Sequence, residues 1–263
     1  MKVGLSTACF YPDVTEHSLQ LASELGFSTC ELFINAECEF SPSYIKKLRI
    51  FCEAHSIAVN SLHPYTSGTE NILFFSGYER RVQDGIAQYE RYFQALSELG
   101  GKYFTFHGTR KVVQDTYVTA GACEFDIYRR LCDAAARYGV VFCQENVVWT
   151  KASDLSYIEQ LQHHVPEISF TLDIKQARRA GVSYDDYIKV MGKRLANLHI
   201  SDYNEEETCL LPGFGTVDYG ALAQSLAAAG YEGDCIIEVY RANFSDTCEI
   251  LRAKALLEAQ MTF

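Results

Sequence analysis

The sequence predicts an α/β fold: a single (β/α)8 barrel of parallel strands that forms one domain over residues 1–263. Three observations predict it. Short apolar, β-branched runs alternate strictly with amphipathic helical patterns, which is typical of parallel strands joined by right-handed crossovers. Eight such strand–helix units fit into 263 residues, the usual size of a closed α/β barrel. No linker-like or low-complexity segment marks a domain boundary, and 48% hydrophobic residues suffice for one large core.

The first half of the chain contains four strands, each followed by a helix. Glycine and proline mark where these elements begin and end: Gly26, Gly100 and Gly139 stop helices, and Pro42 suits a first helical position. Asp13 or Thr15 is the expected N-cap of the first helix. The expected strands are 2–8, 29–34, 58–63 and 103–107, and the expected helices are 13–25, 41–55, 79–99 and 123–138.

The second half repeats the same pattern. Its strands are nearly continuous apolar runs, as expected when both faces of a strand are buried. The expected strands are 140–147, 168–173, 195–202 and 235–240, and the expected helices are 155–165, a broken segment 176–191, 219–229 and 245–259.

The composition argues against several classes of partner. With 23 Lys and Arg against 34 Asp and Glu, the net charge is −11, so nucleic acid is not an expected partner. No run approaches the roughly 18 apolar residues of a membrane span, and the N-terminal apolar stretch is too short for a signal peptide. Ten cysteines without a CxxC pair indicate reduced thiols, and a cytoplasmic location is expected.

Polar residues at the ends of the predicted strands are the candidate functional residues. In (β/α)8 barrels the catalytic groups lie at the C-terminal ends of the strands, where the loops gather. Six residues of the third to eighth strands meet this criterion: His63, His107, Glu145, Asp173, His199 and Glu238.

Glu145, Asp173, His199 and Glu238 each close an apolar run, about one strand–helix unit apart. Three carboxylates that converge at one mouth repel each other unless a cation lies among them. Oxygen ligands with one imidazole suit a divalent ion such as Mn²⁺, Mg²⁺, Co²⁺ or Zn²⁺. The alternative for each acid is that it is solvated by a loop or caps the next helix. His63 and His107 could likewise only hydrogen-bond a loop carbonyl.

Seven short motifs, in this order and spacing, resemble the xylose isomerase-like TIM barrel superfamily. This superfamily includes sugar and sugar-phosphate isomerases and epimerases, and DNA-repair enzymes of the endonuclease IV type. The motifs are SLHPY at 61–65, FHG at 106–108, QENV at 144–147, LDIKQA at 172–177, LHISD at 198–202, PGFGTVDY at 212–219 and IIEVYR at 236–241.

The resemblance implies roles for individual residues. Glu145, Asp173, His199 and Glu238 match the four ligands of one divalent metal ion, and Glu145 and Glu238 match the acid/base pair. The implied reaction is isomerisation or epimerisation of a ketose or sugar phosphate by proton transfer through a metal-stabilised enediolate. The implied substrate contacts are His63, His107, Lys175, Gln176, Asp202 and Arg241, the last toward a phosphate or carboxylate. The partner is then a small-molecule sugar, and a homo-oligomer is possible.

Alternative functions remain open at this stage. Many members of the superfamily carry a histidine where this chain has Gln176, which weakens the case for further metal ions and for a phosphodiester hydrolase. A metal-dependent lyase or dehydratase of a sugar-like acid would begin with the same proton abstraction. A non-catalytic barrel is the remaining alternative, because a fold does not by itself determine a function.

Overall fold

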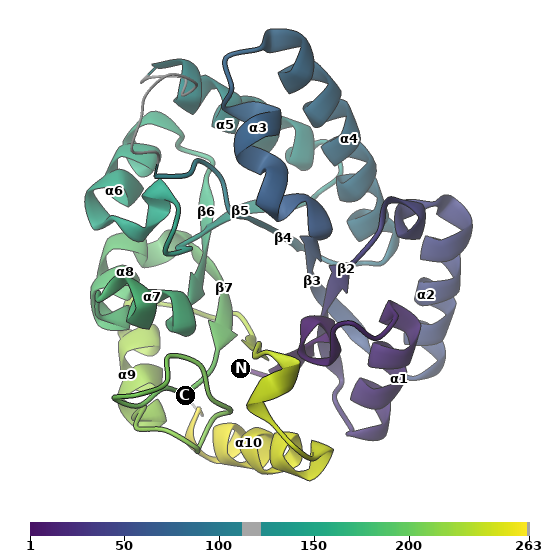
Figure 1. Cartoon of the computed structure of the whole chain (residues 1–263), viewed down its shortest axis with the longest axis vertical. Coiled ribbons are helices and arrows are strands. Elements are labelled where there is room, and N and C mark those ends of the chain that lie inside the picture. The colour runs from purple at the N-terminus through teal and green to yellow at the C-terminus, as the bar shows by residue number, and fades with distance from the viewer. Residues whose placement is uncertain (112–121, 262–263) are drawn as a thin grey trace.

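The computed structural model describes residues 1–111 and 122–261, and these residues form the expected (β/α)8 barrel (Figure 1). The strands are all parallel and close in chain order, with β8 paired to β1. The expected single domain also includes residues 112–121 and 262–263, which lie outside the described residues. The strands are β1 Val3–Ser6, β2 Thr29–Ile34, β3 Ala58–Pro64, β4 Tyr103–Phe106, β5 Val141–Glu145, β6 Ser169–Asp173, β7 Leu195–Ile200 and β8 Cys235–Ile237.

Helices form the outer ring of the barrel (Figure 1). The described helices are α1 Thr15–Glu24, α2 Pro42–Ala54, α3 Glu70–Phe74, α4 Glu79–Glu98, α5 Ala122–Ala136, α6 Leu155–His164, α7 Ile174–Ala180, α8 Tyr184–Met191, α9 Tyr219–Ala229 and α10 Thr247–Gln260. None of them combines the length and the apolar character that crossing a membrane requires.

Most element boundaries lie within a few residues of the expected ones, and three of the differences have a clear physical reason. The broken segment 176–191 is two helices, because Gly181 ends α7 in the left-handed region at φ 69°. The N-cap of α1 is Val14 and not Asp13 or Thr15, since the Thr15 hydroxyl donates to the Phe33 carbonyl instead. The last strand ends at Ile237 because the chain turns into a 3-10 helix, η7 (Arg241–Asn243).

Short helices at the C-terminal ends of the strands were not expected from the sequence. They include α3 and 3-10 segments after β1, β2 and β3, namely η1 Thr7–Phe10, η2 Glu37–Phe40 and η3 Tyr65–Thr69. These segments are too short for an amphipathic pattern to be recognised. They border the same mouth at which the candidate residues end.

A cluster of aromatic rings fixes the strands that carry His107 and Glu145. Phe93 of α4 lies 4.9 Å from Phe104, and Phe106 lies 4.8 Å from Phe142, measured between ring centroids. Such contacts between buried rings hold side chains in single positions. Packing against the helix layer therefore supports the ends of β4 and β5. Functional side chains at such strand ends keep a fixed geometry.

Gly4 provides a test of the packing at the β1–β8 seam. A Cβ atom there would lie 2.5 Å from Ile236 Cδ1 and 2.8 Å from Thr29 Cγ2, so Gly4→Ala should lower the free energy of unfolding by about 1–3 kcal/mol. Gly68→Ala is the control, because nothing lies within 4 Å of its added Cβ. Urea unfolding measures both, and an unchanged midpoint for Gly4→Ala would contradict the packing described.

Candidate functional site

Four consecutive strands deliver the four acid and histidine candidates to one place. Glu145 ends β5, Asp173 ends β6, His199 lies near the end of β7, and Glu238 follows β8 directly. One donor atom from each of these residues lies within 4.8 Å of the donor atoms of the other three. The strand ends identified in the sequence thus converge at one mouth of the barrel.

The donor atoms of this cluster suit a bound cation. His199 Nδ1 lies 3.5 Å from Glu145 Oε1 and 3.5 Å from Glu238 Oε2. His199 Nδ1 is buried without a hydrogen bond to any described residue. Glu145 Oε2 and Asp173 Oδ2 are buried too, and their close neighbours are the ion-pair partners His107 Nε2 at 2.9 Å and Lys175 Nζ at 3.1 Å. Buried polar atoms nearly always have a partner, so a buried imidazole nitrogen that faces carboxylates needs an explanation. A divalent ion that takes oxygen and imidazole ligands fits this donor set.

Glu31 lies behind His199 and was not identified from the sequence. Its Oε2 is 2.8 Å from His199 Nε2 and accepts a 2.8 Å hydrogen bond from the Ser61 hydroxyl. With Nε2 assigned as the N–H that donates to Glu31, the lone pair of Nδ1 faces the carboxylates. Glu31 stands in the middle of β2 and not at its end. The one available signal was an acid inside an otherwise apolar strand, TCELFI.

Lys175 places a positive charge directly in the acidic cluster. This residue of α7 is buried, and its Nζ lies 2.6 Å from Glu238 Oε2 and 3.1 Å from Asp173 Oδ2. Burial alone would lower the pKa of Lys175, but the two carboxylates outweigh it and hold the pKa well above its usual value. The ammonium group therefore stays charged and neutralises part of the cluster.

The acids respond differently to their shared burial. Burial acts to raise all three pKa values. At Glu238, the charges of Lys175 and His199 outweigh burial and lower the pKa to about 2. At Glu145, the charge of His107 outweighs burial and lowers the pKa well below its usual value. At Asp173, burial prevails over the charge of Lys175 and raises the pKa to about 7. Glu145 and Glu238 are thus the carboxylates that stay ionised near neutral pH.

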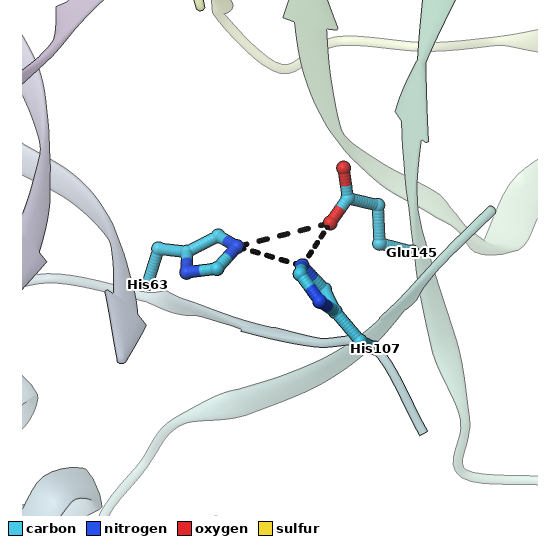
Figure 2. A group of neighbouring side chains, drawn as sticks. All are labelled: His63, His107 and Glu145. Atoms are coloured by element: carbon cyan, nitrogen blue, oxygen red, sulfur yellow. Dashed lines mark hydrogen bonds and ion pairs between the residues drawn. The ribbon is translucent and has the colours of Figure 1, made fainter. Parts of the chain in front are cut away.

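His63 and His107 adjoin Glu145 on its other side. Figure 2 shows both imidazoles turned toward one oxygen of the carboxylate. His107 Nε2 lies 2.9 Å from Glu145 Oε2 and 2.8 Å from His63 Nε2, while His63 Nε2 is 3.9 Å from the same oxygen. Burial and the charge of His107 lower the pKa of His63. Since a hydrogen bond between two imidazoles needs one donor and one acceptor, a neutral His63 can accept from His107.

Glu70 of α3 holds the end of β4 in place. Its Oε2 accepts hydrogen bonds of 2.8 Å and 2.7 Å from the backbone N–H groups of His107 and Gly108. Gln144 adds a 2.6 Å hydrogen bond from its side-chain amide to the His107 carbonyl. Glu70 was not identified from the sequence because helix α3 has only five residues, too few for an amphipathic pattern to be recognised.

A pocket of about 500 Å³ opens above these residues. Among the expected substrate contacts, His63, His107, Lys175 and Gln176 line it, as do both Glu145 and Glu238. The other lining residues are Ala8, Tyr11, Phe33, Asn35, Tyr65, Ser67, Val239 and Tyr240.

Two expected substrate contacts, Asp202 and Arg241, are not among the described residues that line this pocket. The Asp202 carboxylate is buried and accepts hydrogen bonds from the backbone N–H groups of Gly213 and Gly215, at 2.9 Å and 3.0 Å. It fixes the loop after β7. Arg241 donates to the Phe244 carbonyl at 3.0 Å. The resemblance placed both at the substrate because spacing along the chain does not reveal where a side chain points.

Comparison with known proteins gives relatives of the same architecture. The chain is 25% identical to the 3-dehydro-D-guloside 4-epimerase of Escherichia coli K12 over 90% of its length and 92% of the relative's. It is 21% identical to the fructoselysine 3-epimerase of E. coli O157:H7, covering 91% and 90% of the two chains. The crystal structure of D-psicose 3-epimerase with D-tagatose, from Clostridium cellulolyticum H10, superposes with a TM-score of 0.82 at 17% identity, over 100% of both chains.

The model of one protein family matches residues 19–260, which include the six strand-end candidates, Glu31 and Lys175. Together with the closed barrel and the cluster at its mouth, this match shows that the chain belongs to the xylose isomerase-like TIM barrel family.

Proposed function

We propose that this protein is a divalent-metal-dependent sugar isomerase or epimerase that uses Glu145 and Glu238 to move a proton on a keto sugar. One observation carries the proposal: these two carboxylates stand at the two ends of the arc of strands β5 to β8, and both face one pocket. Each also lies 3.5 Å from the same imidazole nitrogen, His199 Nδ1. The relatives that are named as sugar epimerases support this reaction class.

Glu145, Asp173, His199 and Glu238 would hold one Mn²⁺, Mg²⁺, Co²⁺ or Zn²⁺ ion. When bound, such an ion supplies Lewis-acid polarisation of the substrate carbonyl, which acidifies the neighbouring C–H group. Glu31 supports this role from behind, because its hydrogen bond to His199 Nε2 orients the ring with Nδ1 toward the cluster.

The proton transfer itself belongs to the two glutamates. One carboxylate accepts the proton from the carbon next to the carbonyl. The other first takes a proton from its own neighbour, His107 for Glu145 or Lys175 for Glu238, and then delivers it to the substrate from a different side of the pocket. The proton that the first carboxylate has gained is released to solvent, and the neighbour regains one, so the site returns to its starting state. Each glutamate is held ionised by a positively charged or proton-donating neighbour, Glu145 by His107 at 2.9 Å and Glu238 by Lys175 at 2.6 Å. A carboxylate that is ionised and within reach of the substrate is what a general base requires.

The pocket favours a sugar without a phosphate group. Lys175 is the single Lys or Arg among the described lining residues, and Asp173 and Glu238 already share its ammonium group. Phosphate sites normally provide free guanidinium or ammonium donors. Arg241, expected to contact a phosphate, is engaged by the Phe244 carbonyl. The cytoplasmic location and the possible homo-oligomer stay predictions.

The acid/base assignment predicts the effect of two substitutions. Glu145→Gln and Glu238→Gln should each slow the incorporation of solvent deuterium into a panel of ketohexoses and 3-keto-hexoses by at least about 100-fold, because an amide cannot accept the proton. Proton NMR in D2O measures the exchange, and circular dichroism checks the fold. The exposed Glu232→Gln is the control and should exchange at the wild-type rate. Wild-type exchange in Glu145→Gln or Glu238→Gln would refute the assignment.

The role of Glu31 predicts a change in metal affinity. Removal of the carboxylate in Glu31→Ala frees the His199 ring to rotate, so affinity for Mn²⁺ or Co²⁺ should fall about 10–100-fold. Competition with a chelating dye measures the affinity without any substrate. Glu31→Gln keeps an acceptor for the His199 N–H and should lose less. Equal affinities of wild type and Glu31→Ala would show that the contact does not orient the ligand.

The ion pairs of Lys175 predict a stability effect that depends on metal. In chelator, Lys175→Met leaves Asp173 and Glu238 without their shared counter-ion, and the free energy of unfolding should fall by about 3–5 kcal/mol. Excess Mn²⁺ should recover part of this loss, because an ion that binds the folded state stabilises it. Thermal unfolding measures both conditions. The control, Lys189→Met, removes an exposed ion pair and should change little. A wild-type melting temperature for Lys175→Met in chelator would contradict this role.

A further inference from the structure

We propose that the outer part of the pocket is a subsite for an uncharged, preferably aromatic, substituent carried by the sugar, with Tyr11 and Phe33 as its specificity-determining residues. The inference rests on the proposed function, since it places the reacting sugar at Glu145 and Glu238. It adds the class of substrate: a glycoside or similarly substituted sugar.

The volume of the pocket exceeds what one sugar ring fills. At the ~30 Å³ that liquid water allots to each molecule, the twelve non-hydrogen atoms of a hexose occupy at most about 360 Å³. The pocket holds about 500 Å³. A hexose whose reacting carbons lie against the carboxylates therefore leaves space on the solvent side.

A series of rings leads from the reacting groups into that space. His63, which adjoins Glu145, lies 5.0 Å from Phe33, and Phe33 lies 6.5 Å from Tyr11, measured between ring centroids. His63 is only 4% exposed, Phe33 is half-buried and Tyr11 is 57% exposed. The series thus runs from the floor of the pocket to solvent. The Phe33 ring is tilted by 36° against His63, and Tyr11 meets Phe33 edge-on at 75°, so an apolar substituent finds ring faces and edges to contact along the series.

Tyr11 and Phe33 form the aromatic wall of the outer pocket, and hydrogen bonds fix the backbone of both residues. The Phe33 N–H donates to the Thr7 hydroxyl at 2.7 Å, and the Phe33 carbonyl accepts from Thr15 and Asn35. The Tyr11 N–H donates to the Ala8 carbonyl at 3.1 Å. A pre-formed wall loses little conformational entropy when a ligand covers it, which favours binding.

The wall also lacks charge. The lining residues beside Tyr11 and Phe33, namely Asn35, Tyr65 and Ser67, are all neutral, whereas the charged lining residues belong to the floor. A phosphate or carboxylate substituent would lose its hydration there without gaining a counter-ion. An uncharged ring that can stack and accept or donate single hydrogen bonds suits this surface.

Binding of unreactive glycosides tests the subsite without turnover. NMR titration of the full chain with excess Mn²⁺ compares phenyl β-D-glucoside with methyl β-D-glucoside. The phenyl compound should bind wild type about three- to tenfold more tightly, which corresponds to one aromatic contact. Tyr11→Ala should abolish this ratio. The control is Tyr78→Ala, because Tyr78 is 55% exposed and does not line the pocket. It should keep the ratio.

The same variants then separate this inference from the proposed function. With 3-keto-D-glucose and its phenyl glycoside, Tyr11→Ala should raise KM for the glycoside about three- to tenfold more than it raises KM for the free sugar. Equal binding of the two glucosides to wild type, or an unchanged ratio in Tyr11→Ala, overturns the subsite whatever the activity. A preserved binding ratio without deuterium exchange on any keto sugar refutes the proposed function and leaves the subsite standing.

Discussion

The concentration of negative charge at the barrel mouth is the constraint on which the site depends. Glu31, Glu145, Asp173 and Glu238 lie together, largely out of water, where like charges are costly. Within the described residues, each acid has a cationic or proton-donating neighbour, and Lys175 serves two of them at once. The unpaired Nδ1 of His199 marks where compensation by protein groups stops. The proposed cation would complete the arrangement at this point.

Support for this cluster comes from polar residues that do not touch the pocket. Glu70 fixes the backbone of His107 and Gly108, and Asp202 gathers the loop after β7 through several backbone N–H groups. Each is a buried carboxylate whose lone pairs are used by the main chain, which makes the loops as well determined as the strands. The rim of the barrel is thereby held on the side of β4 and on the side of β7, which flank the strands that carry Glu145 and Asp173.

The sequence allowed the strand ends to be predicted but not the contacts behind them. Apolar runs that stop at Glu145, Asp173 and His199 are visible because parallel strands buried on both faces differ sharply from loops. Glu31 was not identified because an acid inside an apolar strand is a weak signal, and its role depends on His199, which is distant along the chain. Asp202, chosen for its spacing from His199, accepts hydrogen bonds from the local backbone. Direction of a side chain follows from tertiary packing, which spacing does not encode.

The two halves of the barrel contribute different things to the pocket. Strands β5 to β8 position Glu145, Asp173, His199 and Glu238, whose donor atoms lie within 4.8 Å of one another. The uncharged wall comes from the first half: Tyr11 follows η1, Phe33 lies in β2 and His63 lies in β3. Because wall and floor lie on different strands, changes in the wall can alter which sugar binds without moving the carboxylates. The four-residue cluster therefore belongs to the second half of the chain, and the rings of Tyr11 and Phe33 belong to the first.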